Sequence, residues 1–135
     1  MIVLASRQLF EGQTMFNYLL VGLGSFCGGL IRYWVALLFV SKKEMLFPYS
    51  TLLVNISGCF LIGIILGLYA KGHLSNEVKL LLITGFLGGF TTFSAFSMET
   101  VLLIKQGLII QSILYILASV VLGLLATGSA YYLFK

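Results

Sequence analysis

Two charged side chains lie inside long apolar stretches of this sequence, and they are the first candidates for chemistry. They are Arg32 and Glu99. A charge at the centre of a bilayer costs about 2.5–3.5 kcal/mol on insertion scales, so each needs a compensating role. Arg32 either extends its long stem to the membrane interface or concentrates anions at the mouth of a pore. Glu99 is either an interfacial carboxylate or a hydrogen-bonding, proton-linked group beside a polar path.

Neutral hydrogen-bond donors accompany these charges. The side-chain amide of Asn55 can donate two hydrogen bonds, which would either join two helices or contact an anion. Ser112, Tyr115 and Ser119 are spaced i, i+3 and i+7, so they form a stripe of hydroxyls on one helix face. Hydroxyls and amides can donate to an anion without introducing a fixed positive charge. This pattern favours a polar path for an anion.

Two aromatic residues share the third apolar stretch with a polar face. Phe93 and Phe96 are three residues apart, and Thr92, Phe96 and Glu99 are spaced i, i+4 and i+7 on one face. The edges of aromatic rings carry partial positive charge, so a pair of them can flank a dehydrated anion. Taken alone, two phenylalanines in a membrane helix are more often core or lipid contacts.

Signals for enzymatic chemistry are missing from the sequence. The one histidine lies in a loop, and no nucleophile stands near a base. Cys27 and Cys59 have neither a CxxC nor a metal-type spacing, and no phosphate-cradling loop of the Walker type is present. The net charge of +4 comes without a cluster of Lys and Arg, which argues against nucleic-acid binding. We therefore expect neither an enzyme nor a nucleic-acid-binding protein.

The composition indicates which elements position these residues. Of 135 residues, 60% are hydrophobic and only 9% are charged, whereas soluble domains carry about 25% charged residues. A span needs roughly 20 apolar residues, and four such stretches lie at about 16–40, 49–70, 78–104 and 108–134. We predict one membrane domain over residues 15–135. Residues 1–14 read as an N-terminal extension, with Met15 as a candidate start.

Glycine spacing distinguishes the third span from the others. Gly24 and Gly28 are four apart, as are Gly63 and Gly67, which lets helix backbones approach closely. The third span instead has three glycines within residues 85–89, followed by two threonines, which is a poor continuous helix. A break at membrane depth exposes backbone groups that must face protein, water or an ion. The pattern favours a functional break over a merely flexible packing segment.

Basic residues are distributed almost evenly between the two sides of the predicted membrane domain. The termini and the middle loop carry Arg7, Lys71, Lys79 and Lys135, and the other side carries Lys42, Lys43 and Lys105. Such a balance gives no firm orientation by the positive-inside rule. It permits insertion in both orientations, and with it an antiparallel dimer.

Three ordered motifs resemble those of one family. They are GSFCGGLIRY at 24–33, TLLVNISGCF at 51–60 and GFLGGFTTFSAFSME at 85–99. Together with four spans, they resemble the Fluc (CrcB) fluoride channels of microbes over nearly everything from Met15 onward. The family usually has glycine where Ser25 stands and alanine where Gly29 stands, and both exchanges replace one small residue by another.

The resemblance implies an antiparallel, dual-topology dimer with two separate fluoride pores in the microbial plasma membrane. The full motif set in one chain favours a homodimer. By position, the resemblance implies pore-lining or anion-binding roles for Phe93, Phe96, Asn55, Tyr115 and Ser119.

Further positions carry implied roles outside the pore. Arg32 resembles the vestibule arginine of the family. The break in the third span implies a structural sodium ion at the dimer centre, bound by the carbonyls of Gly88 and Thr91 from each subunit. Carbonyl oxygens suit a hard cation such as sodium. The hydroxyl track of the family usually continues one turn after Ser119, where Gly123 stands in this chain.

We therefore predict an all-α membrane protein with four transmembrane helices, the third broken, that lets fluoride leave the cytoplasm passively. Its partners would be fluoride, the lipid bilayer and a second copy of itself. The predicted pore residues are Asn55, Thr92, Phe93, Ser94, Phe96, Glu99, Tyr115 and Ser119. A small proton-coupled multidrug exporter is one alternative, but its coupling carboxylate would lie in the first span, which carries Arg32 instead. A non-transporting membrane scaffold would leave the aligned polar residues unexplained.

Overall fold

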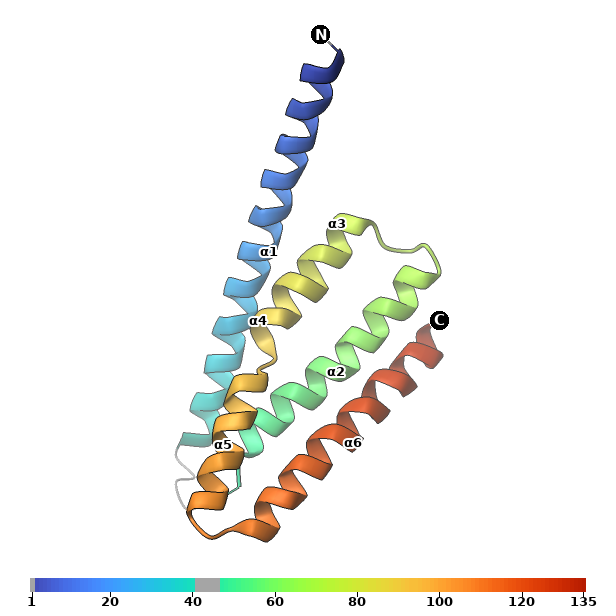
Figure 1. The fold of residues 1–135 in the computed structure, drawn as a ribbon. Helices are drawn as coiled ribbons and strands as arrows, with labels where there is room; N and C mark the ends of the chain where they lie inside the picture. Colours follow the sequence, from blue (N-terminus) through green and yellow to red (C-terminus); the bar gives the residue numbers. More distant parts are fainter. Residues whose placement is uncertain (1, 41–46) are drawn as a thin grey trace.

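A computed structural model describes the backbone of residues 2–40 and 47–135, and the side chains of 12–39 and 47–135. In these residues all regular secondary structure is helical (Figure 1). The elements are α1 (Ile2–Val40), α2 (Tyr49–Ala70), α3 (Asn76–Lys79), η1 (Leu80–Leu87), α4 (Gly88–Phe90), α5 (Phe93–Lys105) and α6 (Ile109–Phe134). Lys42, Lys43 and Glu44, expected to close the first span, lie outside the described residues, as does the side chain of Arg7.

Four segments of the described chain are long and apolar enough to cross a bilayer, as predicted. They are Gly12–Phe39, Tyr49–Ala70, Asn76–Lys105 and Ile109–Phe134. The first helix begins earlier than the apolar stretch that predicted it, because Gln, Arg, Leu and Glu in residues 4–13 favour helix without being uniformly apolar. Figure 1 shows this end of α1 projecting past the other helices. A translational start at Met15 stays a prediction.

The third span is broken, which confirms the sequence prediction. It runs through α3, the wider π-helical turns of η1 and the short α4, and helix resumes only at Phe93 in α5. Thr91 (φ −80°, ψ 156°) and Thr92 (φ −149°, ψ 115°) between them are extended. Figure 1 shows α5 leaving the line of α4 at this point. The break exposes backbone groups in the middle of a membrane segment.

Glycines allow the first span to touch the third span backbone to backbone. A Cβ at Gly24 would lie 2.5 Å from the carbonyl oxygen of Leu81, and one at Gly28 would overlap the carbonyl oxygen of Phe86. From the opposite side, a Cβ at Gly89 would overlap the carbonyl oxygen of Ser25. The hydroxyl of Ser25 also donates to the carbonyl of Gly85 at 3.2 Å. This confirms close packing for the Gly24–Gly28 pair.

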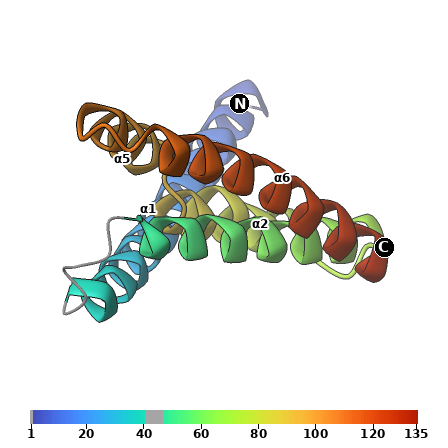
Figure 2. The ribbon, with the colours of Figure 1, turned by 90° about the horizontal axis from the view of Figure 1, so that it is seen from below.

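Glycine contacts also join α2 to α6, which lie side by side in both Figure 1 and Figure 2. A Cβ at Gly63 would overlap the carbonyl oxygen of Thr127, and one at Gly67 would lie 2.9 Å from the backbone of Phe134. The hydroxyl of Thr127 donates to the carbonyl of Cys59 at 2.9 Å. The Gly63–Gly67 pair is thereby confirmed as a second packing site. The packed pair α2 and α6 lies beside the broken third span.

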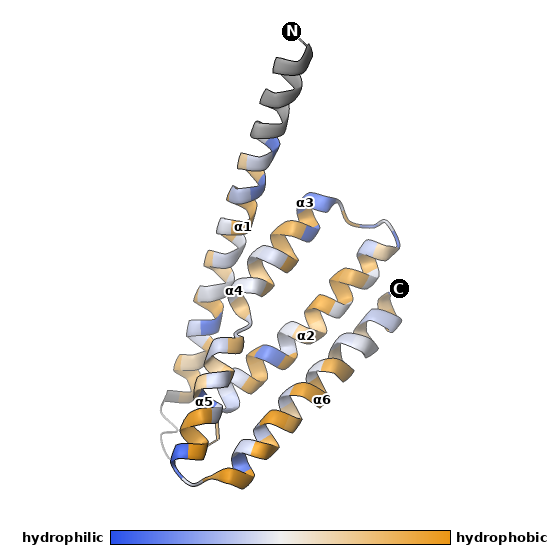
Figure 3. Cartoon of the chain, in the orientation of Figure 1, coloured by the Kyte–Doolittle hydropathy of each residue, from blue (hydrophilic) through white to orange (hydrophobic). Residues whose placement is uncertain are grey.

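Apolar side chains face outward over most of the described molecule. Only a small core is buried, with Val54, Leu87 and Phe90 packed together between α2, η1 and α4. Figure 3 shows hydrophobic residues along all the long helices, and many of the large ones are exposed. This distribution suits a chain whose solvent is lipid, since lipid contact replaces a buried core.

Candidate functional site

Asn55 pairs with the backbone at the break. Its Oδ1 accepts from the amide of Thr92 at 2.8 Å, and its Nδ2 donates to the carbonyl of the same residue at 3.1 Å. Asn55 lies within α2, so this helix positions the break. The amide thus joins two helices, and its second Nδ2 hydrogen is left for another acceptor.

The break changes the partners of several carbonyls. In an α-helix the amide of Thr92 would bond the carbonyl of Gly88, four residues earlier, but it donates to Asn55 instead. The amide of Ala95 would likewise bond the carbonyl of Thr91, but it donates to the hydroxyl of Thr92 at 3.2 Å. Gly88 and Thr91 therefore present carbonyl oxygens that have lost their helical partners.

Arg32 supplies a hydrogen-bond donor to a third carbonyl at the break, that of Gly89. Its Nε donates to the carbonyl of Gly89 at 3.1 Å, across the contact between α1 and α4. Gly89 would otherwise bond the amide of Phe93, which lies beyond the break. The side chain thus reaches the break of the third span rather than simply extending away from it, and it brings a positive charge to the end of α4.

Glu99 holds two hydroxyls from neighbouring helices. Its Oε1 accepts from Thr51 of α2 and its Oε2 accepts from Tyr115 of α6, each at 2.7 Å. Thr51 and Tyr115 are both buried. Thr51 was not predicted as a functional residue, although it lies one helical turn before Asn55 on the same face. Three spans therefore meet at one carboxylate.

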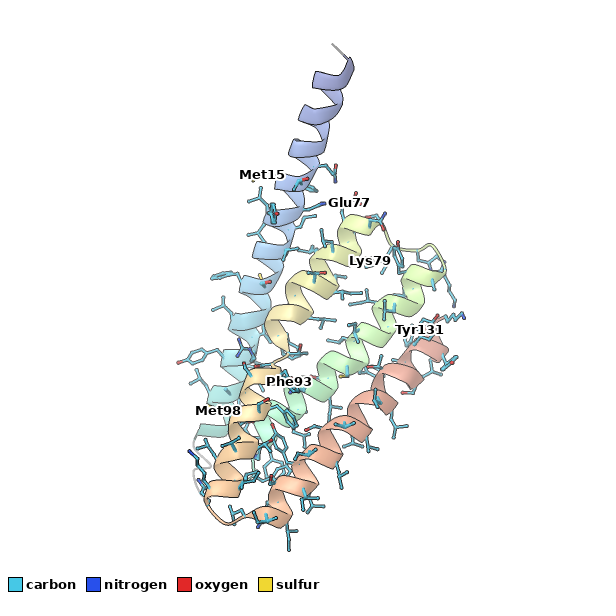
Figure 4. All side chains as sticks on the ribbon, in the orientation of Figure 1. Met15, Glu77, Lys79, Phe93, Met98 and Tyr131 are labelled. Carbon is cyan, nitrogen blue, oxygen red and sulfur yellow. The ribbon has the colours of Figure 1, made fainter. Side chains whose placement is uncertain are left out.

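Aromatic rings continue from the break toward Glu99. The ring centroids of Phe93 and Phe96 are 5.6 Å apart, and those of Phe96 and Tyr115 are 5.1 Å apart. Phe47 adds an edge-on contact to Tyr115 at 5.5 Å. Phe93 is 79% exposed, and Figure 4 shows it at the start of α5, beside α2. The predicted pair, Phe93 and Phe96, is therefore adjacent, and the ring of Phe93 is exposed in the single chain.

The hydroxyl stripe of the fourth span lies on its inner face. Ser112 and Tyr115 are buried, and the Oγ of Ser119 is buried with no hydrogen-bond partner among the described residues. At the next turn, a Cβ at Gly123 would lie 3.3 Å from the Sγ of Cys59. The thiol of Cys59 therefore lies beside the position that lacks a hydroxyl.

A hollow of about 320 Å³ brings five of the predicted residues together beside the break. They are Asn55, Gly88, Thr91, Thr92 and Phe93, joined by apolar side chains and Cys59. Ser94 is not among the lining residues, but its hydroxyl is 3.2 Å from that of Thr92, which is one of them. Phe96, Glu99, Tyr115, Ser119 and Arg32 do not line the hollow. The predicted residues thus form two groups. One lines the hollow, and the other consists of Glu99, Tyr115 and Phe96, which contact one another through Tyr115. Ser94, Ser119 and Arg32 belong to neither group.

The oxygen atoms at the break fit a hard monovalent cation. The described side chains include no group of three or more His, Cys, Asp or Glu that could hold a metal. The available ligands are instead the backbone carbonyls of Gly88 and Thr91, which have lost their helical partners and belong to two residues that line the same hollow. Neutral carbonyl oxygens suit a cation of low charge better than they suit a transition metal.

These features define a class of protein: a small polytopic helical membrane protein whose third span is broken beside a hollow. The chain belongs to the family described as CrcB-like protein, Camphor Resistance (CrcB), whose profile matches residues 19–131. The resemblance drawn from the three motifs is confirmed, and the chain is a multi-pass membrane protein.

Curated relatives cover most of the chain. "Fluoride-specific ion channel FluC" of Azobacteroides pseudotrichonymphae is 44% identical over 115 residues, which are 84% of this chain and 92% of the relative. The protein of the same name from one strain of Thermus thermophilus is 47% identical over 82% of this chain and 88% of the relative. That from Rhizobium etli strain CIAT 652 is 45% identical over 85% and 93%. These relatives are named as channels, not as enzymes.

Proposed function

We propose that this chain is a fluoride-selective channel that lets fluoride leave the cytoplasm passively. The observation that carries the proposal is the row of neutral donors and aromatic rings that begins at the break, with Asn55, Phe93, Phe96 and Tyr115 in sequence. The names of the relatives support fluoride as the ion.

Fluoride is small and strongly hydrated, so a selective path must replace its water molecules with other donors. The second hydrogen of the Asn55 amide, the hydroxyls of the fourth span and the ring edges of the phenylalanines supply them. A narrow path of this kind excludes larger halides by size. Because each donor is neutral or weak, the anion can still leave, as conduction requires.

The pores require a second subunit in this proposal. A single chain leaves Phe93, which lines the hollow, 79% exposed. An antiparallel copy would cover this face and produce two equivalent pores by symmetry. The nearly even distribution of basic residues supports insertion in both orientations.

A structural sodium ion would be held by the carbonyls of Gly88 and Thr91 of both subunits. When bound, it would supply a positive charge that ties the two breaks together at the dimer centre. The support is that both carbonyls have lost their helical partners and that both residues line one hollow. In the same proposal, Arg32 concentrates anions in a vestibule while its Nε holds Gly89.

Fluoride efflux from liposomes tests the proposal directly. Purified protein in liposomes loaded with fluoride should release it rapidly, as read by a fluoride electrode, while chloride-loaded liposomes of the same preparation retain their chloride. Proton-driven uptake of a cationic dye would instead support the exporter alternative. A folded dimer that releases no fluoride would contradict the proposal.

A further inference from the structure

The side chain of Asn55 does more at the break than offer a donor to an anion. Both ends of its amide contact one residue, since Oδ1 accepts from the Thr92 amide and Nδ2 donates to the Thr92 carbonyl. Two reciprocal bonds fix the backbone of Thr92 relative to α2. The break thus has a defined partner on the neighbouring helix, and its geometry does not depend on the two threonines alone.

The contact between Asn55 and Thr92 determines whether the carbonyl of Gly88, four residues before Thr92, accepts a hydrogen bond from the Thr92 amide. If the Thr92 amide were free, its favoured partner would be the carbonyl of Gly88, because an unsatisfied amide at membrane depth is costly. That bond would close the helix across the break. By accepting the Thr92 amide, Asn55 keeps the carbonyl of Gly88, a residue that lines the hollow, free of that bond.

Thr92 acts in the same way on the other carbonyl. Its hydroxyl accepts from the amide of Ala95 at 3.2 Å and so caps α5. Without that cap, the Ala95 amide would bond the carbonyl of Thr91, the next one available four residues earlier. Two side chains therefore keep two carbonyls free. Asn55 occupies the amide that would bond to the carbonyl of Gly88, and Thr92 occupies the amide that would bond to its neighbour, the carbonyl of Thr91.

We propose that Asn55 and Thr92 are positioning residues of the cation site, so that a pore side chain and the bound cation are linked through the backbone of one residue. This inference rests on the proposed function, because it takes the sodium site from it. The two residues need not touch the ion. They act by holding two amides away from the oxygen atoms that would bind it.

Sodium-dependent thermal stability of the purified dimer tests the role of Asn55. The unfolding midpoint in detergent is measured while sodium chloride replaces choline chloride at constant ionic strength. Asn55→Ala should raise the sodium concentration for half-maximal stabilisation about tenfold, because the Thr92 amide can then bond back to Gly88. Asn55→Asp keeps the acceptor atom and adds a negative charge beside the cation site, so it should need no more sodium than the wild-type protein, and it should nevertheless lose fluoride flux because its charge repels the anion.

A second pair of variants tests Thr92 independently. Thr92→Val removes the cap with little change in shape and should weaken the sodium response, whereas Thr92→Ser retains the hydroxyl and should preserve it. Ser57→Ala is the matched control on α2, since its hydroxyl bonds to the carbonyl of Val54 in its own helix. This control should respond to sodium as the wild-type protein does.

Amide hydrogen exchange over residues 88–95 gives a readout independent of ion binding. In sodium-free buffer, Asn55→Ala should alter exchange in this segment and Ser57→Ala should not. A normal sodium response in both Asn55→Ala and Thr92→Val would overturn the inference while leaving the channel intact. A wild-type dimer that conducts fluoride but ignores sodium would overturn the inference together with the proposed sodium. A wild-type dimer that responds to sodium without conducting fluoride would support the cation site and remove only the channel function.

Discussion

At the scale of single residues, polar groups and aromatic rings from α2, α5 and α6 form a row from the break to Glu99. Asn55 holds the break, Phe93 and Phe96 follow it, and Tyr115 connects the rings to Glu99. Few of these groups carry charge. The one carboxylate in the row is engaged by two hydroxyl donors, which keeps it fixed in place.

The phenylalanines are the residues whose replacement should affect transport with the least effect on folding. We expect Phe93→Ile and Phe96→Ile each to lower fluoride efflux from liposomes at least about tenfold, because an aliphatic side chain has no electropositive ring edge. Both variants should elute as dimers on size-exclusion chromatography. Phe26→Ile is the control, because Phe26 is exposed on α1 and outside this row. Unchanged efflux in both variants would argue against the aromatic pair as pore lining.

Glu99 should contribute to stability as well as to transport. Glu99→Ala would leave the hydroxyls of Thr51 and Tyr115 without their acceptor, and we expect a loss of about 1–3 kcal/mol in the free energy of unfolding. Glu99→Gln retains an acceptor and should cost about 1 kcal/mol or less. Equilibrium unfolding in mixed detergent micelles would measure both. Glu77→Gln, an exposed carboxylate in α3, is the matched control, and a Glu99→Ala protein as stable as this control would refute the prediction.

Sequence reasoning found most of these residues because each conflicts with its apolar surroundings. Asn55, Arg32 and Glu99 are conspicuous for that reason alone. Thr51 was missed because a threonine in a membrane helix usually bonds its own backbone. The contact from Arg32 to the carbonyl of Gly89 was not predictable, since it depends on how closely α1 and α4 pack.

At the scale of elements, glycines bring two pairs of spans into direct backbone contact. Gly24 and Gly28 of α1 meet η1 and α4 with no side chain between them, and Gly63 and Gly67 do the same between α2 and α6. Close backbone contact replaces the hydrophobic effect, which gives little drive for association inside lipid. The broken third span is thus held on one side by α1 and on the other by α2.

Two neighbouring glycines provide a matched test of that contact. Gly28→Ala places a carbon against the carbonyl oxygen of Phe86, whereas Gly29→Ala meets nothing within 4 Å. We expect Gly28→Ala to lose about 1–3 kcal/mol of stability through overpacking. Gly29→Ala should be neutral or gain up to about 1 kcal/mol from its higher helix propensity. Thermal midpoints in detergent would compare the two, and equal midpoints would show that α1 can shift away without cost.

The element boundaries followed closely from hydropathy, because the apolar stretches end at turn residues. Gly72 and Gly107, both with positive φ, lie in the turns that close α2 and α5. Hydropathy could not locate the start of the first helix, since a helix continues through polar residues of high propensity. The π-helical turns of η1 left no distinct pattern in the sequence, because the same apolar residues would suit an α-helix.

At the scale of the whole molecule, the chain has the distribution of apolar surface expected for a protein that is solvated by lipid. Large hydrophobic side chains lie outward on every long helix, and the buried core is small. Charged residues of the described part gather near the ends of the spans, apart from Arg32 and Glu99 (Figure 3). Nothing in this distribution assigns one end to the cytoplasm.

Dual insertion is therefore the expectation for the whole molecule. In intact cells, a His73→Cys chain treated with a membrane-impermeant maleimide should be labelled to about half, because the basic residues set no firm orientation. The other half should react only after permeabilisation. The unsubstituted chain, with Cys27 and Cys59 inside spans, is the background control. Labelling near zero or near completion would indicate a single orientation and would contradict the antiparallel dimer.

The exposure of Phe93 has a consequence for a cell that carries both a normal and an altered copy of the gene. In the proposed dimer, a subunit altered at Phe93 still folds and pairs, because Phe93 lies outside the glycine contacts that hold the helices together. In a cell that makes both forms, mixed dimers would form, and each would keep the pore whose residues come from the normal chain and lose the other pore. A subunit altered at Gly28 to a side chain too large for the contact would fail before pairing and leave normal dimers untouched. The first allele would therefore leave half-active dimers in the membrane, whereas the second would leave fewer dimers that are each fully active.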